Sequence, residues 1–302
     1  MRFIRNILII LIGIILISSL PVLFYGGSGF QYIVEVLVAN NISTIGFYPL
    51  EYGLAIVEVV KNLFQPDQWV IATFGKEYSF FEFYPNRYFY SLKLFSFSFL
   101  IAIGVSLLVT MMVSLSPGWF KKVSNFTIDI LESLPDVFII VGLQLIVVFI
   151  YKATGNLVAE VAMLNEEIYL LPIICLSTVP AVFLIKTALL LMREEEPKPY
   201  MDLARAKGLS RLRVLLVHNF RNVLFSLFYR SKIIFSFMLS NLFIIERLFN
   251  IKGIMDLLLY SNQLILVVVI CSIFIPFYTL FSISEFFIMR KIGVREEEFM
   301  NG

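Results

Sequence analysis

The stretch IYLLPIICLSTVPAVFLIKTALLLM, Ile168–Met192, is long and apolar enough to cross a lipid bilayer as a helix. The hydrocarbon core of a bilayer is about 30 Å thick, and a helix needs about 20 residues to cross it. The whole chain shares this character, because 59% of its residues are hydrophobic, only 15% are charged, and its mean hydropathy is +0.88. A soluble domain carries about 25% charged residues, so the sequence predicts a membrane protein.

Five further runs of similar length have the same composition. Backbone groups in lipid must be hydrogen-bonded within the chain, and none of the runs alternates with a period of two, so helices are expected rather than barrel strands. The predicted fold class is all-α, a polytopic membrane protein with six transmembrane helices. The predicted segments are Phe3–Tyr25, Arg87–Leu115, Val123–Tyr151, Ile168–Met192, Val223–Ile245 and Gln263–Met289.

The first segment also resembles the start of a signal peptide, since Arg2 and Arg5 precede the apolar run Ile7–Leu23. A cleaved signal has a shorter apolar core and a cleavage site of small residues, a pattern that FYGGSGF, Phe24–Phe30, does not have. We therefore expect the segment to be a membrane anchor.

Lys and Arg residues outside the predicted helices lie mostly on one side of the membrane, the side of both termini and of residues 193–222. Loops rich in Lys and Arg stay in the cytoplasm. The prediction is a multi-pass protein of the plasma membrane with both termini cytoplasmic. It is a single transmembrane domain over 1–302, with an extracellular loop over 26–86 and a cytoplasmic loop over 193–222. The net charge of +2 is too small to indicate nucleic-acid binding.

The cytoplasmic loop contains YMDLARAKGLSRLRVLLVHNFRN, Tyr200–Asn222. Its first part has helix-forming composition, Gly208 can adopt the left-handed conformation that ends a helix, and Ser210 can cap a second helix. In the second helix Leu212, Leu215 and Leu216 form an apolar stripe. This pattern predicts a helix hairpin that docks onto a cytoplasmic partner. The alternative is an amphipathic loop that rests on anionic lipid headgroups.

The order of residue types within the hairpin carries a family resemblance. Asp202-Leu203-Ala204, followed after three residues by Gly208, resembles the E-A-A-x3-G loop of permease subunits in ATP-binding cassette importers. The longer pattern is similar to the oligopeptide, dipeptide and nickel branch of that family. The resemblance implies that the hairpin couples the permease to an ATPase. The coupling residues it implies are Tyr200, Asp202, Ala204, Arg205, Lys207, Gly208, Leu209, Arg213, His218 and Asn222.

Weaker matches extend over most of the chain. Arg87–Leu94, Ser133–Phe138 and Glu246–Gly253 resemble the start of the second helix, the s-x-P-x-x-F region and the outer loop of the family. The chain also departs from the pattern, because Lys252 and Ser226 stand where the family usually has Pro. These departures indicate a divergent member.

The resemblance implies that the chain forms half of a translocation pathway for peptides or related small solutes. The implied partners are a second homologous permease subunit, two cytoplasmic ATPase subunits and an extracellular substrate-binding protein. The sequence contains no G-x-x-x-x-G-K-[ST] phosphate loop, so we expect a non-enzymatic subunit that binds no cofactor, with ATP and Mg on the ATPase subunits. No His or Cys residues have metal-site spacing, so no metal is expected.

Charged residues within two of the predicted spans form a second candidate site. Asp129, Glu132 and Asp136 lie at i, i+3 and i+7 and share one face of the third predicted helix. Arg230 and Lys232 lie at a similar depth in the fifth. We expect this face to line a polar pathway, with Arg230 as the direct partner because its planar fork suits a carboxylate. The alternative is that both helices extend into water at this point.

Two other classes of function remain open from the sequence. A secondary transporter would need no ATPase and usually has paired structural repeats, which the sequence lacks. A non-transporting or exporter-like membrane subunit would use the same hairpin to recruit an ATPase. Pro135, Pro172 and Pro180 predict bends that would accompany movement of the helices, and the alternative for each is an ordinary kink of a membrane helix.

Overall fold

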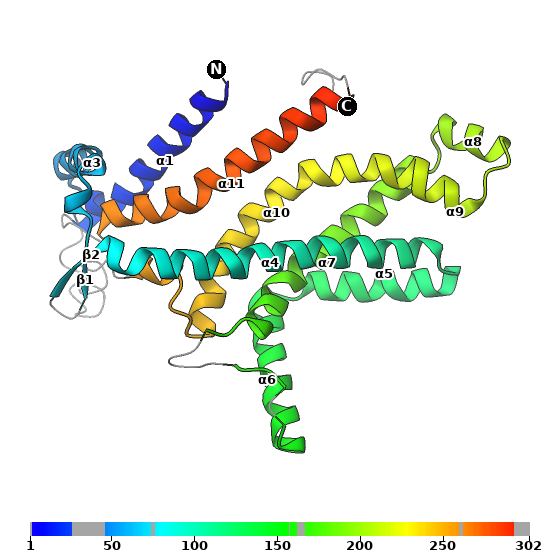
Figure 1. The fold of residues 1–302 in the computed structure, drawn as a ribbon, viewed down its shortest axis with the longest axis horizontal. Helices are drawn as coiled ribbons and strands as arrows, with labels where there is room; N and C mark the ends of the chain where they lie inside the picture. Colours follow the sequence, from blue (N-terminus) through cyan, green and yellow to red (C-terminus); the bar gives the residue numbers. More distant parts are fainter. Residues whose placement is uncertain are drawn as a thin grey trace. The chain divides into compact units, whose positions relative to one another are not determined.

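The computed structural model describes residues 2–25, 46–73, 76–156, 158–161, 167–259 and 262–292. The fold is all-α apart from one small strand hairpin among these residues, which confirms the predicted fold class (Figure 1). The chain falls into two compact units, one formed by residues 1–88 and 253–302 and the other by residues 89–252. Residues 26–45 of the predicted outer loop lie outside the described residues.

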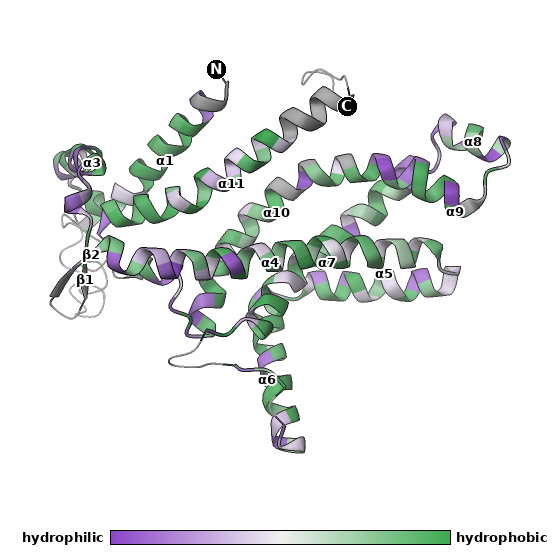
Figure 2. Ribbon diagram, viewed as in Figure 1, coloured by the Kyte–Doolittle hydropathy of each residue, from purple (hydrophilic) through white to green (hydrophobic). Residues whose placement is uncertain are grey.

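The first unit is built on three helices, α1 (Arg2–Tyr25), α3 (Pro49–Leu63) and α11 (Gln263–Ile292). Helix α1 packs against both of the others, and Ile15, Val59 and Val267 form the buried cluster between them. Apolar residues cover α1 and α11 along most of their described length, as a lipid-facing helix requires (Figure 2).

The segment between α1 and the next span has structure of its own. After α3, the short 3-10 turn η2 (Pro66–Gln68) leads into an antiparallel hairpin of β1 (Val70–Thr73) and β2 (Lys76–Ser79). Arg87 donates to Asp256 of the 3-10 turn η4 (Met255–Leu259) at 2.9 Å. The predicted loop 26–86 is therefore partly helical and partly β within its described residues.

Helix α4 (Phe80–Leu115) begins seven residues before the predicted start and ends at the predicted residue. Its first residues, Phe80–Tyr88, belong to the first unit and the remainder to the second. Pro85, the sixth residue of α4, removes one backbone hydrogen bond near the start of the helix.

The second unit is arranged around α7 (Leu170–Glu195), which contacts α5 (Gly118–Ser133), α6 (Asp136–Thr154) and α10 (Phe220–Leu248). In the most apolar stretch of α7, 61% of the residues are buried, compared with 11% in α6. Val113 of α4, Ile128 of α5 and Ile185 of α7 belong to one buried cluster. Helix α7 is therefore the core of this unit, and movement of α7 would affect three neighbouring helices.

The prediction of one continuous helix over Val123–Tyr151 is wrong. The structure has two helices here, because α5 ends at Ser133 and α6 begins at Asp136. Leu134 has an extended backbone, with φ −81° and ψ 135°. Pro135 explains the break, since its ring disfavours the helical conformation in the residue before it and it has no N–H to donate.

Five helices are long and apolar enough to cross a membrane, and the number rises to six if the bent pair Val214–Phe228 and Ile233–Leu248 is counted as one span. The two parts of that pair meet at an angle of 54°. Six spans were predicted, and among the described residues the third of these is α6 without α5. The membrane-protein class is confirmed on length and composition.

Candidate functional site

The basic loop folds into the predicted helix hairpin. Helix α8 (Pro199–Ala206) is followed by Gly208 with φ +71°, a left-handed conformation that a residue with a Cβ adopts at a cost. The N–H groups of Gly208 and Leu209 bond to carbonyl oxygens of α8 at 2.9 and 3.4 Å, which satisfies the end of that helix. After the turn, the carbonyl oxygen of Ser210 accepts the N–H of Val214 at 3.0 Å, which starts the second helix.

The second helix of the hairpin is continuous with α10. It consists of α9 (Arg211–Arg213) and the π-helical stretch η3 (Val214–Asn219), which runs directly into Phe220. A π-helical turn is rare and marks a local distortion of the helix. The sequence pattern gave no signal for this distortion.

A small apolar core holds the two hairpin helices together. Met201, Ala204 and Val214 are buried, and Tyr200 and Leu209 pack against them. Three of the predicted coupling residues, Tyr200, Ala204 and Leu209, therefore help to fix the shape of the hairpin.

Polar contacts attach the hairpin to the end of α7. The Tyr200 hydroxyl donates to the Glu195 carboxylate, and Asn222 donates to the Tyr200 oxygen at 3.0 Å. Lys198 donates to the same carboxylate at 2.5 Å. Burial and the hydrogen bond to Glu195 both raise the pKa of Tyr200, so the hydroxyl keeps its proton.

A second attachment joins η3 to α7. The amide nitrogen of Asn219 donates to the carbonyl oxygen of Met192 at 3.0 Å, and the Asn219 side chain is buried. Tyr200 and Asn222 are among the predicted coupling residues, whereas Glu195 and Asn219 are not. The only sequence signal for the contacts of Glu195 and Asn219 is that both residues lie near the ends of helices.

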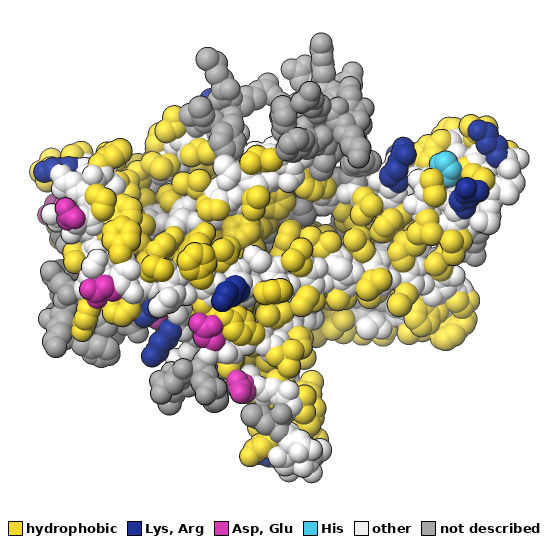
Figure 3. Space-filling view, viewed as in Figure 1, with side chains coloured by type: hydrophobic (Ala, Val, Ile, Leu, Met, Phe, Trp, Pro, Cys, Tyr) yellow, Lys and Arg dark blue, Asp and Glu magenta, His cyan; other side chains and the backbone are white. Residues whose placement is uncertain are grey.

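The outer side of the hairpin is both apolar and charged. Leu203, Leu212, Leu216 and Val217 are exposed, and Leu203 and Leu212 have more than half of their surface accessible. Asp202, Lys207 and Arg213 are exposed beside them, and His218 is half-buried. The space-filling view shows Lys and Arg side chains with the single His on this part of the molecule (Figure 3). Arg205 pairs with Asp202 at 3.1 Å.

The second predicted site is assembled differently from the prediction. Lys186 of α7 pairs with Asp129 of α5 at 3.0 Å and also with Glu132. Arg230 is exposed and makes no ion pair among the described residues, so the predicted pairing of this stripe with Arg230 is wrong. The Lys232 side chain lies outside the described side chains.

The break at Pro135 removes Asp136 from the shared helical face. Asp136 opens α6 and accepts a hydrogen bond from the Asn241 amide of α10 at 2.7 Å. Lys186 is not among the predicted site residues, although it is the one charged residue within the apolar run Ile168–Met192. That isolation was a usable signal, because a lone ammonium in a span requires a partner.

Long apolar helices, with a basic hairpin held at the end of the most buried one, define a polytopic membrane protein. The family model described as binding-protein-dependent transport system inner membrane component matches residues 102–293. This is more than half of the chain, and the chain belongs to that family. The match confirms the resemblance to permease subunits of ATP-binding cassette importers.

A search of curated proteins finds the dipeptide transport system permease protein DppB of three Escherichia coli strains. Each is 36% identical to this chain over 83 residues, which is 28% of this chain. The matched stretch spans 23% of the length of these relatives. The similarity supports the peptide branch of the family.

Proposed function

We propose that this chain forms half of the translocation pathway of an ATP-binding cassette importer for peptides or related small solutes. A second homologous permease subunit completes the pathway, and two cytoplasmic ATPase subunits bind ATP and Mg and drive it. An extracellular protein delivers the solute. The proposal is supported by the family match, the partial similarity to a dipeptide permease, and the absence of a phosphate loop from the sequence.

The double attachment of the hairpin to α7 is the observation that best supports the proposal. Tyr200 bonds to Glu195 and Asn219 bonds to Met192, so both hairpin helices are joined to the same helix end. A short, internally packed hairpin moves as a rigid body. Force that an ATPase applies to its exposed outer side would therefore reach α7 directly.

Movement of α7 would also move the Lys186 ion pairs, which we place in the pathway. Lys186 lies within the α7 span, and its partner Asp129 is 60% exposed in the isolated chain. Charged groups at membrane depth face a polar pathway or a neighbouring subunit because lipid does not solvate them. We infer that Asp129, Glu132 and Lys186 line the pathway at the contact with the second permease, and that tilting α7 relative to α5 moves this charge group.

The orientation follows from the same proposal. The hairpin and both termini lie in the cytoplasm of the cell, since these segments carry most of the Lys and Arg residues outside the spans. The chain itself has no enzymatic activity in this scheme.

The proposal is tested by extracting the protein in a mild detergent, identifying the subunits that accompany it, and reconstituting the assembly in liposomes. We expect two ATPase subunits and a second permease, with solute uptake that requires ATP. Uptake by an assembly without ATPase subunits would identify a secondary transporter and contradict the proposal. Co-purifying ATPase subunits without any uptake would identify a non-transporting subunit.

A further inference from the structure

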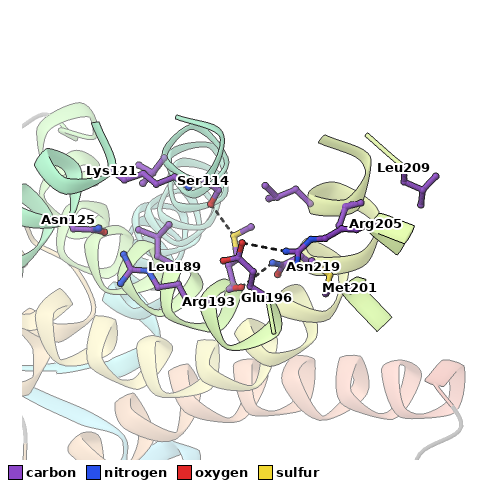
Figure 4. Close-up of a pocket in the computed structure, with 14 residues that line it drawn as sticks. Ser114, Lys121, Asn125, Leu189, Arg193, Glu196, Met201, Arg205, Leu209 and Asn219 are labelled. Atoms are coloured by element: carbon purple, nitrogen blue, oxygen red, sulfur yellow. Dashed lines mark hydrogen bonds and ion pairs between the residues drawn. The ribbon is translucent and has the colours of Figure 1, made fainter. Parts of the chain in front are cut away.

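A cavity of about 420 Å³ lies between the hairpin and the ends of α4, α5 and α7 (Figure 4). Its lining residues all belong to the second unit. The volume falls within the range of about 300 to 1,000 Å³ that small-molecule sites occupy. ATPase docking requires the outer side of the hairpin, whereas this cavity lies on the inner side.

Asn219 lines the cavity, and its side chain includes a buried acceptor without a donor among the described residues. Asn219 is 4% exposed, and its amide nitrogen donates to the Met192 carbonyl oxygen. A carbonyl oxygen can only accept, so this bond fixes the orientation of the amide. The Asn219 Oδ1 atom is buried and has no hydrogen-bond partner among the described residues. A buried acceptor is normally satisfied, so the cavity suits a ligand with a hydroxyl or ammonium group.

The polar lining of the cavity carries an excess of positive charge. Lys121 and Arg193 line it, and neither forms an ion pair within the described part of the chain. Arg205 on the hairpin side is already paired with Glu196, at 3.5 Å. Figure 4 shows Lys121 and Arg193 away from Arg205, whose ion pair with Glu196 is drawn as a dashed line. Two cations in one cavity, without ion-pair partners among the described residues, favour an anion that accepts several hydrogen bonds, above all a phosphate.

The remaining lining is apolar. Val113, Leu189 and Val214 contribute aliphatic surface, which suits the carbon part of a ligand better than an inorganic ion. We propose that the cavity binds a phosphate ester that also bears a hydroxyl or ammonium group. Its phosphate contacts Lys121 and Arg193, and its hydroxyl or ammonium group donates to Asn219 Oδ1. An anionic phospholipid headgroup and a soluble phosphate ester share this chemistry.

Such a ligand would contact the helix body and the hairpin at the same time. Lys121 belongs to α5 and Arg193 to α7, whereas Asn219 belongs to the second hairpin helix. Occupancy would strengthen the attachment of the hairpin to α7 and so adjust coupling. That consequence rests on the proposed function, but the binding itself does not.

Binding is tested on the full-length chain in detergent by native mass spectrometry, with dioctanoyl phosphatidylglycerol and glycerol 1-phosphate as probes. The double variant Lys121→Ala, Arg193→Ala removes both free cations and is expected to bind roughly tenfold more weakly or worse, since each removal loses a charge-assisted hydrogen bond. The control Lys122→Ala removes a neighbouring exposed cation that does not line the cavity, and its affinity should equal that of the wild type. Matched thermal melting curves would show that all variants are folded.

Binding of phosphatidylglycerol alone would support the site and assign it to a lipid headgroup, and binding of both probes would support it and show that the headgroup is sufficient. Equal affinity in the wild type, the double variant and the control would overturn the proposal, as would failure of the wild type to bind either probe. These results are independent of transport, so they are distinct from failure of the proposed function.

Discussion

Single residues decide the local geometry of both candidate sites. Gly208 lets the chain reverse between the hairpin helices because its φ of +71° carries little steric cost for glycine. Lys186, within the α7 span, neutralises part of the charge that Asp129 and Glu132 of α5 bring beside it. Each residue supports a prediction that separates its role from a general effect on folding.

The first prediction concerns Gly208→Val. A β-branched residue in the left-handed region costs about 1 to 3 kcal/mol, so the hairpin should lose its shape while the spans still insert. We expect ATP hydrolysis by the assembly to continue and solute uptake per ATP to fall several-fold. Gly208→Asn is the matched control, since Asn tolerates this conformation and should retain most of the coupling. Equal uptake per ATP in the Val and Asn variants would argue against a coupling role for the turn.

The second prediction concerns Lys186→Ala, which leaves two carboxylates without their cation. Without the ammonium, Asp129 and Glu132 repel each other beside the α7 span, where lipid does not solvate charge, so the amount of assembled transporter should fall strongly. Combining it with Asp129→Asn and Glu132→Gln should restore assembly, as measured by size-exclusion chromatography. Arg230→Ala should have little effect on assembly, because Arg230 is outside the pairing. Loss in Arg230→Ala that matched the loss in Lys186→Ala would contradict this assignment.

Among the helices and strands, the hairpin and most spans could be predicted from the sequence, and the third span could not. Hydropathy identifies a span by its average composition, and this average hides the backbone effect of one residue such as Pro135. The same error placed Asp136 on the face of Asp129 and Glu132 and turned attention away from Lys186. The Gly208 turn was predictable because it depends only on neighbouring residues, whereas the contacts of Glu195 and Asn219 depend on how the helices pack.

The third prediction tests the break between α5 and α6. Spin labels at Val123 and Tyr151, both exposed, would be about 42 Å apart along one straight helix, from a rise of about 1.5 Å per residue. Figure 1 shows α6 leaving the direction of α5, so we expect a clearly shorter distance. Pulsed electron paramagnetic resonance measures this distance. A distribution centred near 42 Å would support the continuous helix instead.

At the scale of the whole molecule, three parts of the second unit act in sequence in the proposed function. We propose that the exposed apolar and basic outer side of the hairpin binds an ATPase, that the contacts of Tyr200 and Asn219 transfer its movement, and that α7 carries the movement to the Lys186 ion pairs. The central claim is that the outer side of the hairpin, with Leu203 and Leu212 exposed, is the ATPase-docking surface. Membership of the transport family fits this arrangement.

The most direct test replaces Leu212 with the photoreactive residue benzoylphenylalanine and irradiates the assembled transporter in its membrane. The account predicts a cross-linked product that contains this chain and an ATPase subunit, and a change in its yield when ATP is bound. The control position is Leu100 on α4, which is exposed to a similar extent but lies in a membrane-spanning helix, and it should give no product with the ATPase. A product of equal yield at Leu100, or no ATPase product at Leu212 in an assembly that hydrolyses ATP, would contradict the account.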